Sequence, residues 1–116
     1  MKDTVSLKHN RDFRRLYSKG KSAVSPYFAV YYRKNRLDVN RLGITVGGKL
    51  GNAVTRNRLR RRIREIYRTN EVRFLSGYDI VVVGRTRAVS ARYAVLEESL
   101  IRLAGGLSLL SGTIKS

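Results

Sequence analysis

Apolar residues recur at helical spacing near the start of the chain. In HNRDFRRLYSKG, Phe13, Leu16 and Tyr17 are three and four positions apart and therefore share one helical face. Polar residues that suit a helix start precede them, and Gly20, a common helix end, follows them. The pattern predicts a short amphipathic helix that ends near Gly20.

A longer helix is predicted in the middle of the chain. Asn52 suits an N-cap, and neither Gly nor Pro interrupts the chain from there until Gly77. We expect this helix to run from about Ala53 to about Val72. Its apolar residues share one stripe that is suited to packing on a sheet: Leu59, Ile63 and Ile66.

A third helix is predicted in SARYAVLEESLIRLAGG. Its apolar residues gather on one face: Tyr93, Leu96, Leu100 and Leu103. Gly105 and Gly106 mark its end. The tail at 107–116 is small, apolar and weakly patterned, and the sequence leaves open whether it docks on the body or frays.

Alternating apolar residues predict strands between these helices. In SPYFAVYYRKN the period is two, with Pro26 at or before the strand start, and Ile44 and Val46 alternate in LGITVGG. Turn residues in NRLDVNR separate these segments, so an antiparallel hairpin is predicted, and Lys21–Val24 is a candidate for a further short edge strand. YDIVVVGRT is apolar at nearly every position, which indicates a strand that is covered on both faces or central in its sheet.

The predicted order is helix, two or three strands, helix, strand, helix. A chain of 116 residues fits one domain with a real core, and neither a repeat nor a linker divides it. We therefore predict a single domain over 1–116, in which 1–9 and 107–116 are the segments where flexibility is expected. The hydrophobic share is 42% and there is no cysteine, so folding is expected to need neither metal nor disulfides.

The charge of the chain indicates its class of partner. There are 25 Lys and Arg against 8 Asp and Glu, a formal net charge of +17. Positive charges at this density repel one another, which disfavours the compact state. They also attract polyanions, of which nucleic acid is the first candidate and a membrane surface the second. Because the chain has neither a signal peptide nor an apolar run that could span a bilayer, we expect a cytoplasmic protein that binds nucleic acid.

The predicted central helix concentrates this charge. The segment GNAVTRNRLRRRIREIYR, at 51–68, holds seven arginines and a single acid, Glu65. Helical spacing gathers its polar and basic residues into an exposed ridge and a flank. The ridge is Asn57, Arg61, Arg64 and Arg68, with Arg60 beside it, and the opposite flank holds Arg58 and Arg62.

Solvated surface is the ordinary explanation of a charge run, but it fits this helix poorly. Like charges four positions apart, such as Arg60 and Arg64, cost about 0.2–0.5 kcal/mol each in an isolated helix. Arginine can grip a phosphate with two parallel hydrogen bonds or stack on a base. Backbone N–H groups at the helix start, after Gly51 and Asn52, add a further place for phosphate. We therefore predict that this helix binds a polyanion.

Aromatic residues crowd one predicted strand and the first helix. YFAVYY has four rings in six residues, and Phe13 and Tyr17 lie on the helix. One face of the strand must supply core. On its other face, an exposed Tyr27, Tyr31 or Arg33 beside the helical rings offers a platform for unpaired bases with a cation nearby. The spacing alone does not choose between core and platform.

Catalytic and metal-binding groups are scarce in the sequence. His9 is the only histidine, Glu97 and Glu98 point different ways on a helix, and the other acids are scattered. The chain contains no phosphate-binding loop, nucleophile elbow or metal-ligand spacing. We therefore expect neither catalytic residues nor a metal site on this chain.

The segment KLGNAVTRNRLRRRIREIYR resembles the signature of the bacterial ribonuclease P protein subunit, in which Arg-Asn-Arg follows Gly-Asn-Ala-Val. The likeness extends to RDFRRLYSKGKS, FAVYY, RLGITVGGK and YDIVVVGR, and so covers roughly Asn10 to Leu103. Gly48 departs from the pattern, since many members have a second lysine at this position.

This resemblance implies a fold and an activity. The fold is an α+β sandwich of ribosomal-protein type with about four strands, three helices and a left-handed strand–helix–strand crossover, an exception to the usual right-handed rule. The protein joins a catalytic RNA, and together they remove the 5′ leader from precursor tRNA. The RNA performs the hydrolysis with Mg²⁺ held mainly by the RNA and the substrate, and no obligate protein partner is implied.

The resemblance also assigns residues. The signature helix and the turn before it contact RNA through Lys49, Gly51, Asn52, Arg56, Asn57, Arg58, Arg60, Arg61 and Arg64, to which the predicted ridge adds Arg68. Phe13, Tyr17 and Tyr31 match the aromatic positions of a cleft that holds the single-stranded leader, and the strand pattern adds Arg33. A structural RNA-binding protein of ribosomal type is the alternative, with a stand-alone nuclease third.

Overall fold

Three α-helices and five strands follow one another along residues 3–111, the part of the chain that this computed structural model describes. The elements are β1 (Thr4–Ser6), α1 (Asn10–Lys19), β2 (Lys21–Val24), β3 (Phe28–Lys34), β4 (Asn40–Thr45), α2 (Ala53–Asn70), β5 (Tyr78–Gly84) and α3 (Tyr93–Gly106). The three helices lie where the sequence pattern predicts them. Helix α2 ends two residues earlier than predicted, because the chain turns into a short 3₁₀ helix at Glu71–Arg73.

The strands form one sheet in the order β1-β4-β5-β3-β2. Strand β5 is parallel to β4 and antiparallel to β3, so the predicted hairpin of β3 with β4 is wrong. The hairpin rule assumes that consecutive strands pair, whereas β5 is buried at nearly every position and takes the centre of the sheet. Its central place, covered on both faces, is confirmed.

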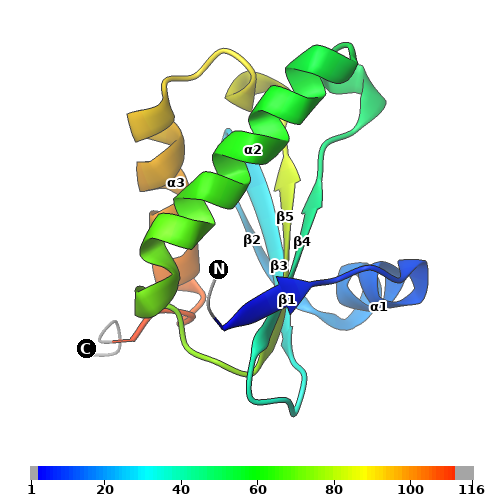
Figure 1. Cartoon of the computed structure of the whole chain (residues 1–116), viewed down its shortest axis with the longest axis vertical. Coiled ribbons are helices and arrows are strands. Elements are labelled where there is room, and N and C mark those ends of the chain that lie inside the picture. Colours follow the sequence, from blue (N-terminus) through cyan, green and yellow to red (C-terminus); the bar gives the residue numbers. More distant parts are fainter. Residues whose placement is uncertain (1–2, 112–116) are drawn as a thin grey trace.

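The chain crosses from β4 to β5 through α2. In Figure 1, β4 and β5 both point upward, α2 descends in front of them, and β5 lies to the left of β4. Two parallel strands joined in this way make a left-handed crossover, as the resemblance implies and against the usual preference. The crossover places the N-terminal end of α2 beyond the end of β4.

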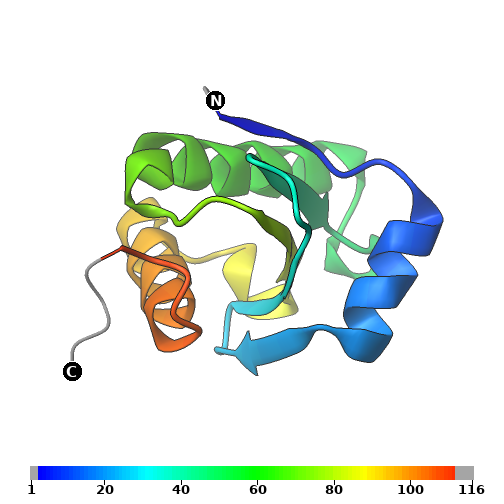
Figure 2. The ribbon, with the colours of Figure 1, turned by 90° about the horizontal axis from the view of Figure 1, so that it is seen from below.

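Helices cover both faces of the sheet (Figure 2). Alternate residues of β5 serve two cores: Ile80 and Val82 pack with α2 and α3, whereas Val81 packs with Leu7 and with Leu16 of α1. The α1 face is therefore covered by one short helix. Tyr31 and Val83 on that face are only partly buried.

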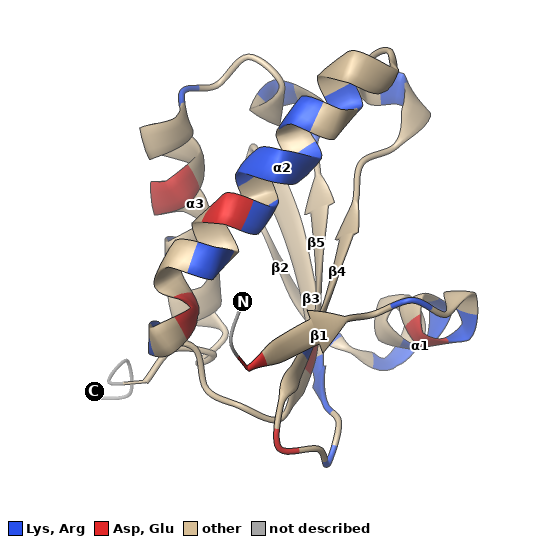
Figure 3. Cartoon of the chain, in the orientation of Figure 1, with Lys and Arg blue, Asp and Glu red and all other residues tan. Residues whose placement is uncertain are grey.

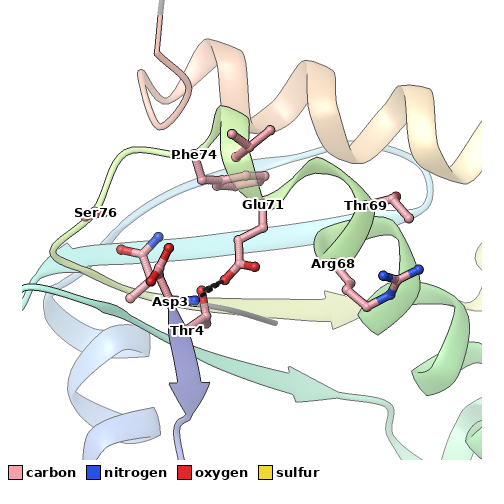
Figure 4. A pocket seen from close by; sticks show the side chains of 9 residues that line it. Asp3, Thr4, Arg68, Thr69, Glu71, Phe74 and Ser76 are labelled. Carbon is pink, nitrogen blue, oxygen red and sulfur yellow. Dashed lines mark hydrogen bonds between the residues drawn. The ribbon is translucent and has the colours of Figure 1, made fainter.

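Parts of the two terminal segments pack against the rest of the domain. Thr4–Ser6 pairs with β4 as a fifth strand, and Leu109 and Leu110 are fully buried. Figure 4 shows the Glu71 carboxylate directed at the N-terminal strand, where it accepts hydrogen bonds from the Asp3 backbone N–H (3.1 Å) and the Thr4 hydroxyl (2.6 Å). Positions 1–2 and 112–116 lie outside the described residues.

Candidate RNA-binding site

The start of α2 is a tight turn that requires glycine. Gly51 has φ +142°, which side chains rarely adopt, and the Asn52 side chain accepts a hydrogen bond from the Thr55 N–H at 2.9 Å. Lys49 is exposed in this turn. A Cβ atom at Gly48 would meet nothing within 4 Å, so glycine is not required at this position by crowding.

Helix α2 has one side against the sheet and one toward solvent. Leu59, Ile63 and Ile66 are at most 3% exposed, which confirms the predicted stripe, and Tyr67 extends it. Basic residues recur along the rest of the helix surface (Figure 3). The packing of the apolar stripe therefore fixes which way the arginines project.

Four of the seven arginines have partners within the protein. Arg56 donates to the Gly51 carbonyl oxygen (3.1 Å), Arg60 to the Asn57 side chain (2.6 Å), and Arg62 to the Ala91 carbonyl oxygen (3.0 Å). Arg68 forms a bidentate pair with Glu65, with distances of 3.0 and 2.6 Å. This hydrogen bonding lowers the pKa of Glu65 and raises that of Arg68. Of these four, Arg62 is tied to the segment before α3 and is the one best suited to a structural role.

The other three arginines are unpartnered. Arg58, Arg61 and Arg64 are exposed, and none of their side chains forms a hydrogen bond or ion pair within residues 3–111. We call these three the free arginines. Their charges face solvent without compensation, which is the arrangement that phosphate groups would complete.

Three aromatic rings of α1 and β3 lie together on the α1 face of the sheet. The ring centroids of Tyr17 and Tyr31 are 5.0 Å apart in an edge-to-face arrangement, and those of Phe13 and Tyr17 are 6.5 Å apart. Tyr17 is 42% exposed, and its hydroxyl lies 3.1 Å from that of Thr45 at the end of β4. The rings therefore serve both as packing for α1 and as accessible surface, so neither alternative in the sequence excludes the other.

A hollow of about 160 Å³ lies beside Phe13, one of these rings. Phe13 lines it from α1, Gly43 from β4, and Arg60 and Arg64 from α2. A Cβ atom at Gly43 would lie 2.6 Å from two atoms of the Phe13 ring, so glycine is what allows this ring to lie against the sheet. We call the three rings and this hollow, with its two arginines, the aromatic cleft.

Arg33 is not part of the aromatic cleft. Arg33 lies opposite Asp79 in the sheet register, two residues along β3 from Tyr31, which lies opposite Val81. Its side chain instead lines a separate pocket, with Lys34 and Tyr78 among its neighbours. The strand pattern placed Arg33 on the same side of β3 as Tyr31, but it does not reveal where α1 crosses that face.

A partly buried ion triad links α1 to β4 and β5. Arg41 forms a bidentate hydrogen bond with Asp79 (2.8 and 2.7 Å), and its guanidinium lies 3.6 Å from Asp12 of α1. The hydrogen bonds to Asp79 raise the pKa of Arg41. Asp12 directly precedes Phe13, so the triad fixes the register of the helix that carries the cleft rings. In the sequence these three charged residues are far apart, so the sequence does not show that they interact.

The chemistry of these surfaces is that of recognition. Cations and rings meet around an open cleft, which suits unpaired bases with phosphates beside them. Within residues 3–111, no three His, Asp or Glu side chains gather as a metal-binding group, and no helix is long and apolar enough to cross a bilayer. A hollow of about 430 Å³ at the C-terminal end of α2 is lined by Asp3, Glu71 and Arg68, and because Arg68 already pairs with Glu65, the two acids make it a poor place for phosphate.

Comparisons with known proteins show the family of the chain. The family described as Ribonuclease P matches residues 1–108. The ribonuclease P protein component of Natranaerobius thermophilus is 39% identical over 98% of this chain and 99% of its own.

Two solved structures are also similar. The Staphylococcus aureus RNase P protein has a TM-score of 0.84 at 36% identity and covers 91% of this chain and 97% of its own. The RNase P protein of Thermotoga maritima has a TM-score of 0.79 at 39% identity, and the match covers 84% of this chain and 93% of that protein. The chain belongs to the ribonuclease P protein family.

Proposed function

We propose that this protein binds a catalytic RNA as the protein subunit of ribonuclease P and holds the single-stranded 5′ leader of precursor tRNA while the RNA removes it. The family membership gives the activity, endonucleolytic maturation of tRNA at the 5′ end. The reaction would take place in the cytoplasm, where the precursor transcripts are found. The observation that carries the proposal is the aromatic cleft.

The aromatic cleft has the chemistry of a single-stranded RNA site. The exposed Tyr17 ring and the Phe13 ring offer faces for stacking on bases, and Arg60 and Arg64 stand on the opposite wall, where phosphates would lie. A base stacked on an aromatic ring contributes about 1–3 kcal/mol, with little dependence on sequence. Such a site suits leaders that differ in sequence from one tRNA precursor to another.

The free arginines give the protein a second RNA-facing surface. Arg58 and Arg61 do not line the hollow of the cleft, and they project from α2 without protein partners among the described residues. We propose that these two contact the phosphates of the catalytic RNA, while Arg64 contributes at the border of the two surfaces. Lys49 and the turn at Gly51 and Asn52 lie at the N-terminal end of the same helix and extend this surface.

Mg²⁺ is placed with the RNA in this proposal. The acids nearest the proposed surfaces already hold arginines: Asp12 and Asp79 pair with Arg41, and Glu65 pairs with Arg68. Such carboxylates are poorly disposed to collect a divalent ion. The proposed work of this chain is therefore to bind and orient RNA, and no step passes through an ion held by the protein.

Phe13→Ala is expected to weaken holoenzyme binding of precursor tRNA about tenfold or more, with mature tRNA affected much less. The reason is that loss of one stacked base costs about 1–3 kcal/mol, and each 1.4 kcal/mol changes affinity tenfold. The dissociation constants of both tRNA forms are measured with holoenzyme assembled on saturating catalytic RNA.

Phe74→Ala is the matched control, since it removes the same side chain from a partly buried site beside Tyr67, in the core on the other face of the sheet. This control should leave the ratio of precursor to mature affinity unchanged. Equal losses for the two tRNA forms in Phe13→Ala would refute the assignment of the leader to the aromatic cleft.

A further inference from the structure

A second group of cations and rings lies at one corner of the sheet, away from the surfaces described above. The end of α1, the start of β2, the end of β3 and the start of β5 meet there around a hollow of about 390 Å³. We call this the basic corner; its lining residues are Lys19, Lys21, Tyr32, Arg33, Lys34 and Tyr78.

The sheet register interleaves lysines with tyrosines at this corner. Lys21 stands opposite Tyr32, and Lys34 stands opposite Tyr78. Paired residues of antiparallel strands share a face, and so do positions two apart on one strand. These four side chains therefore lie on one face in a compact block, in which the two tyrosines are diagonal neighbours.

The two tyrosines form an accessible aromatic pair. Their ring centroids are 5.5 Å apart in an edge-to-face arrangement, and both rings are only partly buried at the margin of the larger core. Neither hydroxyl forms a hydrogen bond to another residue within 3–111. Tyr32 and Tyr78 thus present ring surface and free hydroxyl groups beside the lysines.

The positive charges at the basic corner are uncompensated. Lys19, Lys21, Arg33 and Lys34 are exposed, and none of them forms an ion pair within the part of the chain that the structure describes. Asp79 adjoins Tyr78 in sequence, but its two oxygens accept from Arg41 and Asn35. A lysine on an edge strand discourages unwanted strand pairing, which accounts for Lys21 on β2 but not for the other three cations.

The basic corner is separate from the aromatic cleft. Tyr32 and Tyr78 belong to the core on the α2 and α3 face of the sheet, whereas Phe13 and Tyr31 belong to the core on the α1 face. The two sets of rings therefore serve opposite faces. The basic corner is therefore considered as a site distinct from the aromatic cleft.

We propose that the basic corner is an additional RNA-binding site, which takes the phosphates of a single-stranded segment with a base or sugar against Tyr32 and Tyr78. Single strands are bound by this combination of cations and exposed rings. The choice of RNA as the polyanion rests on the proposed function. The segment comes from the leader beyond the aromatic cleft or from the catalytic RNA.

The double variant Lys21→Gln, Lys34→Gln tests this site in the reconstituted holoenzyme. Each lost contact with a single-strand phosphate lowers the salt dependence of log K by about 0.7, which corresponds to about fivefold in affinity at about 0.1 M salt. One arm measures protein binding to catalytic RNA alone. The other measures holoenzyme binding to precursors whose leaders are either short enough to end in the aromatic cleft or longer.

Two further double variants act as controls. Arg73→Gln with Arg102→Gln removes the same net charge at exposed positions outside the basic corner. Lys21→Arg with Lys34→Arg keeps both charges in place and should bind like the wild type. Thermal unfolding is followed for every variant, and little change is expected at exposed positions.

A loss confined to long leaders supports the leader as the source, and a loss in the arm with catalytic RNA alone supports that RNA. The proposal is overturned if the glutamine pair loses no more affinity than the Arg73 and Arg102 control in either arm. If wild-type protein neither binds the catalytic RNA nor stimulates it, the proposed function itself fails. That outcome differs from one in which the wild type stimulates the catalytic RNA and the glutamine pair binds as well as the control.

Discussion

Replacing Arg58, Arg61 and Arg64 together with glutamine is expected to weaken binding to the catalytic RNA about 100-fold at about 0.1 M salt. Each phosphate contact contributes about fivefold under these conditions, and three of them multiply. The slope of log K against log salt should become shallower by about two, since each contact contributes about 0.7. Direct titration of labelled catalytic RNA at several salt concentrations measures both quantities.

Thermal stability should be almost unchanged in this variant, because the three side chains have no partners within residues 3–111. It should even rise slightly, since the removal of like charges along α2 relieves repulsion. Arg62→Gln is the control, because the hydrogen bond from Arg62 to the Ala91 carbonyl oxygen ties α2 to the segment before α3. This control should lower the melting temperature more than the triple variant does and weaken RNA binding less. A large loss of melting temperature in the triple variant would mean that the free arginines are structural.

Arg41→Met is expected to destabilise the protein by roughly 3 kcal/mol. Removing one partner of a buried ion pair typically costs about 3–5 kcal/mol, because the remaining charge is left without compensation. Here Asp12 and Asp79, at side-chain exposures of 7% and 11%, would both lose Arg41, although Asp12 would keep its ion pair with Arg15 (3.5 Å) and Asp79 its hydrogen bond from Asn35. Urea unfolding should show a lower midpoint with an unchanged slope.

Arg102→Met is the matched control for this prediction. Arg102 also pairs with an acid, Glu98, but both side chains are more than two-thirds exposed, so its loss should change stability by less than about 1 kcal/mol. If Arg41→Met costs no more than this control, the triad does not anchor α1. A destabilised α1 would also loosen Phe13 and Tyr17, so the effects of Arg41→Met on RNA binding are interpreted only where the variant is fully folded.

The helices of this fold could be predicted from sequence because each buries a regular stripe. Leu59, Ile63 and Ile66 face the sheet as predicted, and Tyr67 extends their stripe. Strand pairing could not be predicted in the same way, because β5 lies between β3 and β4 and no local sequence pattern indicates which strands become neighbours. Strand β1 is only three residues long and is held by side-chain contacts, such as that of Thr4 with Glu71, from a segment distant in sequence.

The candidate site could be predicted as a class of residues but not in its detail. The density of arginine in α2 predicted an RNA-facing helix, but the partner of Arg62 is supplied by a segment about thirty positions away. Arg33 illustrates the same limit, since alternation along β3 places it on the side of Tyr31, whereas in the structure it lines a pocket with Tyr32 and Tyr78. The left-handed crossover followed from the family resemblance, because the general rule favours the opposite hand.

The most direct test of the account is cleavage of precursor tRNA by a bacterial ribonuclease P catalytic RNA, with and without this protein. At low salt and low Mg²⁺, the protein should raise kcat/KM for leader removal, and the purified protein freed of RNA should cleave nothing. The Phe13→Ala variant should lose part of the stimulation for precursors with a leader. Absence of any stimulation, together with co-sedimentation of the protein with ribosomes, would contradict the account and favour a structural RNA-binding protein of ribosomal type.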